Sequence, residues 1–288
     1  MNISYELEKK IVNLNALYNE EEAELSLRLS QNIRKNQQDG YVYSLISRGF
    51  EIKGLKLWLV DKNIDQLKQW FYVSSVLRAE SCKYSSGYTL STPDEFIFPL
   101  LSDNTEIINK FAYLDTVNLL WGEFEPSYQE AKFKPSKDDP RFRTHALQAV
   151  LRNDWEDYKK IKEVANQKIN KLREVVQFEF GIYDAIYEKD KDKIIEIVQT
   201  LLNPRVHKTY NKDFGEEFNG EIWSHHPVMF TKLAWMNGLE IEIDNPLVPM
   251  ELMPIKPLEH YDYHYDFLDP NWKPKSLFEK LFGKKRNK

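Results

Sequence analysis

The sequence predicts a mainly α-helical protein, an irregular bundle or superhelix of αα-hairpins with a short extended or β segment near the C-terminus. Through residues 1–202, apolar residues recur at spacings of three and four, and polar breaks of two to five residues separate these runs. Only 10 of the 288 residues are glycine, so tight turns are few. The hydrophobic share of 42% and the charged share of 30% are ordinary for a folded chain.

Five apolar stripes predict the helices of the N-terminal part, and we expect their large side chains to form the core. The first two lie early in the chain, the next two flank a polar break near residues 60–63, and the last runs to residue 121. The stripes consist of Ile11, Leu14, Leu17 and Tyr18; of Leu29 and Ile33; of Tyr41, Leu45, Ile52, Leu55 and Trp58; of Ile64, Leu67, Trp70, Phe71, Val73 and Leu77; and of Ile107, Ile108, Phe111, Leu114, Val117, Leu120 and Trp121.

A weak internal repeat marks three helix breaks, at residues 57–67, 149–158 and 185–194. In each, an apolar helix end leads into a short polar turn with Asn or Asp, and an acid follows two residues later. We expect the Asn or Asp to cap the next helix, because its side chain can accept a hydrogen bond from an unpaired N–H group. The three capping residues are Asn63, Asp154 and Asp190. The unit is an αα-hairpin, and its uneven spacing indicates an irregular assembly.

Two longer breaks divide the chain. Residues 122–141 hold three prolines and many charges and are typical of a linker, which either separates two domains or lies across one. Residues 203–224 are longer than a typical connection. The expected parts are N-terminal helical hairpins at 1–121, the linker at 122–141, C-terminal helical hairpins at 142–238, and an extension rich in Pro, Tyr and acids, with a basic tail, at 239–288.

The last quarter of the chain changes character. We expect a short helix with Pro227 at its first position and Asn237–Gly238 at its end. Residues 239–243 and 261–267 alternate with period two, so they are short strands or extended segments that pair with each other or lie over the helices. Residues 276–283 are a short amphipathic helix candidate, either docked on the protein or adhering transiently to an anionic membrane.

Charge and composition exclude several classes of protein. The net charge is −5, and residues 273–288 carry seven Lys or Arg and one Glu, so the remaining body is more acidic still, which argues against nonspecific nucleic-acid binding. The sequence contains no run of 18 apolar residues, so we do not expect stable membrane insertion. A single cysteine, Cys82, and an N-terminus without the apolar core of a signal peptide favour the cytoplasm.

The sequence predicts no catalytic residue, no cofactor and no metal ion, and we do not expect an enzyme. It contains no phosphate-loop, G-x-S-x-G, H-E-x-x-H or kinase-type motif. His260 and His264 are four residues apart, as in helical zinc sites, but the alternation around them favours an extended segment in which they lie about 13 Å apart. A metal site that also uses His225 and His226 is the weaker alternative.

The segment from Glu240 to Asp269 has the most unusual composition. Eight acids stand against one lysine, and tyrosines alternate with acids near its end. Tyrosine is enriched at protein interfaces, and acids steer basic partners. The residues that we expect to contact a partner are Asp262, Tyr263, Tyr265 and Asp266. The alternative is a terminal flap whose Tyr rings cover the helices while its Asp side chains face water, and the two interpretations are compatible.

Three features carry a family resemblance: the nearly all-helical body of this length, hairpin turns such as residues 147–156, and the pattern from His226–Pro227 through Leu233–Ala234 to residues 238–249. On these features, over residues 40–255, the chain resembles the immunity protein 49 family of bacterial polymorphic toxin systems. The resemblance implies a cytoplasmic immunity protein that binds and neutralises one cognate toxin or effector without catalysis. It implies no catalytic residues.

We therefore expect a rigid helical inhibitor that presents a preformed acidic and aromatic surface to a toxin domain. Rigidity limits the conformational entropy lost on binding. Acidity suits a toxin that is a basic nuclease, because such an active site must attract phosphate. The alternative is a helical scaffold or adaptor that binds other proteins or peptides.

Overall fold

The computed structural model describes residues 4–34, 40–83, 93–114, 141–168, 174–210 and 220–272. These ranges hold eleven α-helices, three short 3-10 helices and no β-strand, so the predicted mainly α-helical fold is confirmed. The elements are α1 (Tyr5–Arg34), α2 (Gly40–Leu59), α3 (Ile64–Ser81), η1 (Pro93–Phe96), α4 (Ile97–Ser102), α5 (Thr105–Ala112), α6 (Arg141–Leu151), α7 (Trp155–Lys168), α8 (Glu174–Glu188), α9 (Lys191–Leu202), α10 (Pro204–Tyr210), α11 (His225–Met236), η3 (Met250–Leu252) and η4 (Asp266–Leu268).

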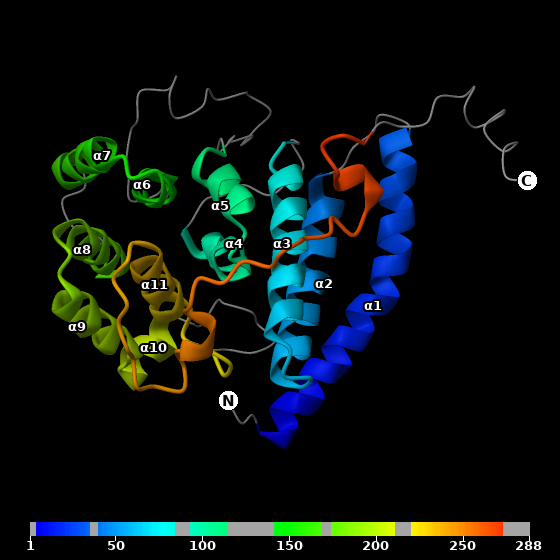
Figure 1. Cartoon of the computed structure of the whole chain (residues 1–288), viewed down its shortest axis with the longest axis horizontal. Coiled ribbons are helices and arrows are strands. Elements are labelled where there is room, and N and C mark those ends of the chain that lie inside the picture. Colours follow the sequence, from blue (N-terminus) through cyan, green and yellow to red (C-terminus); the bar gives the residue numbers. More distant parts are fainter. Residues whose placement is uncertain are drawn as a thin grey trace, which may run out of the picture.

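The helices form two groups joined through the middle of the molecule. Figure 1 shows α1, α2 and α3 on one side, α6 to α9 on the other, and α4 and α5 between them. Helix α11 contacts both α4 and α9. Helices α2 and α3 approach closely because Gly54 faces Phe71, where an added Cβ atom would lie 3.1 Å from the ring.

One hydrophobic core runs through both groups. Its largest fully buried side chains include Phe71 of α3, Phe96 of η1, Phe111 of α5, Tyr183 of α8 and Phe230 of α11. Side chains that precede the predicted linker in the sequence and side chains that follow it therefore belong to the same core. All of that linker except residue 141 lies outside the described residues, so the expected division of the chain at residues 122–141 stays a prediction.

The repeated turns have the predicted capping geometry. In each, a residue with positive φ is followed by the capping residue, whose side-chain oxygen accepts a hydrogen bond from the backbone N–H three residues on. The residues with positive φ are Lys62, Asn153 and Lys189. The capping oxygens of Asn63, Asp154 and Asp190, which follow them, lie 3.0, 3.0 and 2.9 Å from the backbone nitrogens of Gln66, Asp157 and Lys193. Asp103 and Asn104 form a fourth copy that was not predicted, in which Ile107 N–H donates to Asn104 Oδ1 at 2.8 Å.

Several local expectations need correction. Helix α11 begins at His225 rather than at Pro227, which lies within its first turn. Helix α5 ends at Ala112, and the stripe expected to continue to residue 121 leaves the described residues after Leu114. Neither alternating segment near the C-terminus forms a strand, so the two do not pair into a sheet, and the second turns at His264, which has a positive φ, into η4. The amphipathic candidate at residues 276–283 and the basic tail lie outside the described residues.

The caps give a direct test of the hairpin unit. Replacing Asp190 with Ala removes the acceptor for Lys193 N–H and should lower the free energy of unfolding by about 1 kcal/mol, measured by urea titration. Asp192→Ala is the matched control, because it removes the same charge from the same helix end without removing a cap. It should cost only about 0.3 kcal/mol. Equal losses in the two variants would contradict the capping role.

Candidate functional site

The segment predicted to contact a partner belongs to residues 239–272, which we call the C-terminal strap. The strap leaves the end of α11 and crosses the molecule to α1 (Figure 1). In its first part Leu239, Ile241 and Ile243 are buried, while the acids between them are exposed. Alternate side chains of an extended chain point in opposite directions. The predicted period-two pattern is therefore present as alternating burial, although the strap forms no strand.

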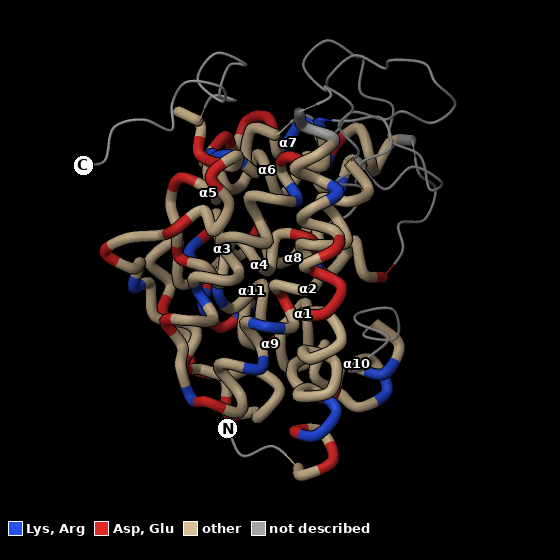
Figure 2. The backbone as a smooth tube through the Cα atoms, turned by 90° about the vertical axis from the view of Figure 1, so that its right-hand side faces the viewer, with Lys and Arg blue, Asp and Glu red and all other residues tan. Residues whose placement is uncertain are grey.

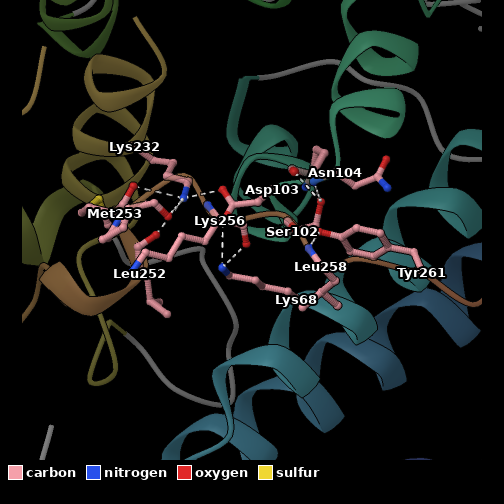
Figure 3. A network of polar contacts seen from close by, with 12 residues as sticks. Lys68, Ser102, Asp103, Asn104, Lys232, Leu252, Met253, Lys256, Leu258 and Tyr261 are labelled. Atoms are coloured by element: carbon pink, nitrogen blue, oxygen red, sulfur yellow. Dashed lines mark hydrogen bonds and ion pairs between the residues drawn. The ribbon is translucent and has the colours of Figure 1, made fainter. Parts of the chain in front are cut away.

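A buried ion cluster fixes the middle of the strap (Figure 3). The carboxylate of Asp103, which ends α4, lies 2.6 Å from Lys232 Nζ of α11 and 2.9 Å from Lys68 Nζ of α3. The side chains of Lys232, Asp103 and Lys68 are 0%, 1% and 6% exposed. One carboxylate thus links three helices that are distant in the sequence.

Backbone carbonyls of the strap complete the ion cluster. Lys232 Nζ donates to the carbonyl oxygens of Leu252, Met253 and Pro254, at 2.8, 3.2 and 3.3 Å. Lys68 Nζ donates to the carbonyl of Lys256 at 2.6 Å, and the N–H of Lys256 donates to Asp103 at 3.2 Å. Burial lowers the pKa of Lys232, and the Asp103 carboxylate opposes that effect. Because a buried ammonium group needs acceptors, the strap is held where it supplies them.

Tyrosine rings then hold the strap against α3. The hydroxyl of Tyr261 donates to the carbonyl of Ser102 at 2.6 Å and accepts from Leu258 N–H at 3.0 Å. The ring centroid of Tyr261 lies 4.9 Å from that of Tyr72, and the ring of Tyr263 lies 5.8 Å from the same Tyr72 ring. These rings face the helices, as the flap interpretation predicts.

The end of the strap contacts α1 and α3. The hydroxyl of Tyr265 donates to Glu22 of α1 at 2.5 Å, and its ring stacks on Phe267 with centroids 4.9 Å apart. His264 packs edge-on against Trp70, with centroids 5.1 Å apart, and its Nε2 lies 3.4 Å from Glu22 Oε1. Hydrogen bonding to His264 is the largest cause of the lowered pKa of Glu22, which burial opposes. The outermost part of the strap is therefore anchored by hydrogen bonds as well as by ring contacts.

The two predicted aspartates face solvent from a fixed backbone. The amide of Gln69 on α3 donates to the carbonyl of Asp262 at 2.7 Å and accepts from its N–H at 3.1 Å. Asp262 and Asp266 are exposed, whereas Tyr263 and Tyr265 are half-buried. The structure brings all four predicted residues together on one segment, with carboxylates outward and rings inward. Figure 2, viewed from the side of α1, shows acidic positions spread over the backbone with basic positions among them.

A groove that the sequence did not predict lies beside these residues. It has a volume of about 340 Å³ and runs between α3, α5 and the end of the strap. Aromatic and aliphatic side chains line it, and a charged group at its edge centres on Glu80, which pairs with Lys83 at 2.7 Å and with Lys110 at 3.3 Å. The apolar lining consists of Tyr72, Val76, Ile107, Tyr263, Phe267, Leu268, Pro270 and Trp272.

The histidines considered as metal ligands take other roles. His260 Nε2 lies 3.0 Å from Asp262, and His264 contacts Glu22. His225 and His226 are buried at the start of α11, where His226 Nε2 lies 3.0 Å from the carboxylate of Asp94 and His225 Nε2 donates to the backbone carbonyl of Asp94 at 2.8 Å. Among the described residues, no three His, Cys, Asp or Glu side chains are grouped so that they could hold a metal ion.

The described helices include none that is long and apolar enough to cross a bilayer. Comparison of the chain with protein-family models, with curated proteins and with solved structures finds no match. The resemblance to the immunity protein 49 family stays a prediction, and the fold and the strap define the chain as an all-α protein with an acidic, aromatic surface segment.

The ion cluster predicts a large loss of stability when one lysine is removed. Lys232→Met keeps the apolar stem but leaves three strap carbonyls without their donor, so the free energy of unfolding should fall by about 3 kcal/mol or more. Limited proteolysis should then cut within the strap. Lys256→Met, whose side chain is exposed, is the control and should change neither measurement. An unchanged cleavage pattern in Lys232→Met would show that the cluster does not hold the strap.

The buried histidine predicts a pH dependence of stability. Burial lowers the pKa of His225 from 6.5 to about 4, and the nearby Asp94 opposes this effect. Since the unfolded chain takes up the proton first, the contribution of His225 to stability should be constant above pH 6.5 and fall by about 3 kcal/mol as the pH falls to about 4. His225→Gln keeps a donor for the Asp94 carbonyl but cannot titrate. Urea unfolding of this variant should show a correspondingly shallower fall over the same pH range.

Proposed function

We propose that this protein is an immunity protein that binds a cognate toxin or effector directly and neutralises it without catalysis. The observation that supports this proposal most is the arrangement of the strap near Asp262. Gln69 holds both backbone groups of Asp262, and the neighbouring tyrosine rings pack on α3, so the outward carboxylates keep fixed positions. A preformed surface loses little conformational entropy on binding.

The groove beside the strap supports the same proposal. Protein interfaces concentrate binding energy where aromatic side chains of one partner enter a pocket of the other, with charged groups around the edge. Here a hollow lined in part by Tyr263, Phe267 and Trp272 lies next to the exposed acids. A side chain of the toxin would enter the groove while the acids engage its basic residues.

The charge of the surface suggests the class of toxin. The strap holds exposed Asp262 and Asp266 and contacts α1 at Glu22, next to exposed Glu21. Such a surface attracts a basic partner and accelerates its association. A nuclease fits this requirement, because its substrate channel must be basic, and the aspartates would then occupy the place of phosphate groups.

The second candidate function is that of an adaptor that binds peptides or other proteins without neutralising a toxin. The groove favours it, because a hollow of about 340 Å³ with both lysines and acids at its edge suits a short peptide as well as a folded domain. Co-expression with a toxin encoded next to the gene separates the two functions. An immunity protein restores growth, whereas an adaptor leaves the toxin active.

Charge reversal tests the proposed surface. Asp262→Lys combined with Asp266→Lys should slow association with the toxin, raise the dissociation constant at low salt by about tenfold or more, and weaken rescue of growth. Surface plasmon resonance at two salt concentrations measures the effect, which should shrink as salt rises because the charges are screened.

The matched control reverses two exposed acids at the other end of the strap. Glu240→Lys combined with Glu242→Lys changes the net charge equally, and both side chains are exposed beside buried Ile241. Equal effects from the two double variants would show that only the net charge of the protein matters for binding, and not the position of Asp262 and Asp266. No effect from either pair would leave the strap as a flap and refute the proposed binding surface.

A further inference from the structure

The outer face of α1 carries a stripe of apolar side chains that are exposed in the described part of the structure. Tyr5, Val12 and Leu27 are 74%, 39% and 59% exposed, and Ala16 and Ala23 between them are exposed as well. Tyr5, Ala16 and Leu27 are eleven residues apart, as are Val12 and Ala23. Eleven residues make just over three helical turns, so all five side chains share one face along about 33 Å of helix.

This stripe is distinct from the face of α1 that packs on the protein. Leu7, Ile11 and Leu29 are buried on the inner face, where α1 contacts α2, and Glu22 contacts the strap. A surface helix ordinarily has one apolar face. Helix α1 has a second, and it lies at the edge of the molecule (Figure 1). Exposed apolar side chains that recur along one helix face in this way are typical of an interaction site.

The charges beside the stripe indicate what covers it. Lys9 is exposed in the N-terminal half of α1, and Glu20 and Glu24 are exposed in the C-terminal half, on the same side of the stripe. If a second copy of α1 runs antiparallel about an axis at Ala16, Tyr5 faces Leu27 of that copy. Lys9 then lies between Glu20 and Glu24 of the other chain, and the two small Ala16 side chains meet at the axis.

Other occupants fit less well. A parallel pair would place Lys9 beside Lys9 and Glu20 beside Glu20, which is unfavourable. An anionic membrane would be repelled by the carboxylates that border the stripe in its C-terminal half, where basic residues would be needed. We propose that the protein forms a two-fold symmetric dimer in which the outer faces of two α1 helices pack antiparallel, centred on Ala16.

The oligomeric state of the full chain in solution tests this proposal. Sedimentation analysis should give about twice the chain mass of 34.3 kDa, with dissociation on dilution. Ala16→Arg places two charges at the symmetry axis and should give a monomer with unchanged helix content, because arginine is a good helix former. A mass of 34.3 kDa for the unaltered chain at every soluble concentration would overturn the proposal.

A charge swap distinguishes antiparallel pairing from any other contact. Lys9→Glu should raise the dimer dissociation constant about tenfold, because in a two-fold symmetric dimer each ion pair occurs twice and both copies are lost. Glu20→Lys with Glu24→Lys should do the same, and all three changes together should restore the original constant. Lys160→Glu, on the exposed face of α7, is the control and should have no effect. Failure of the triple variant to recover would overturn the antiparallel arrangement.

Discussion

The arrangement of the strap depends on the carboxylate of Asp103 between two buried lysines. Two ammonium groups around one carboxylate leave an excess positive charge where Lys232 has no exposed surface. Transferring such a charge from water is costly unless it is paired and hydrogen-bonded. Four carbonyls of residues 252–256 supply the remaining acceptors, so the strap cannot lift away without stripping both lysines of their partners. Helices α3, α4 and α11 and the strap consequently form one unit.

From the ion cluster to the exposed end of the strap, a series of closely spaced contacts holds the backbone in place. Residue 256 is held at the ion cluster, Tyr261 binds the end of α4, Gln69 binds the backbone of Asp262, and Tyr265 binds Glu22. Each step spans only a few residues, and little backbone freedom remains between them. The flap interpretation and the proposed binding surface are therefore compatible, because the inward rings fix the directions of the outward carboxylates.

The parts that the sequence predicted are those set by short-range patterns. Helix periodicity, the caps at Asn63, Asp154 and Asp190, and the alternating burial of the strap each arise within about ten residues. The ion cluster and the groove join residues distant in the chain, which no local pattern specifies. One signal was present: Lys232 interrupts an otherwise apolar helix and should have indicated a buried partner.

The two faces of α1 make different demands on the same helix. Its inner face must match α2 and the strap, where Glu22 accepts from Tyr265, and substitutions there change the fold. On its outer face Tyr5 and Leu27 are mostly exposed, so they contribute little to folding by burial. Exposed apolar residues in a monomer carry a cost in solubility. Their regular spacing over six helical turns is explained by association through this face, which would leave the contact of the strap with the inner side of α1 intact.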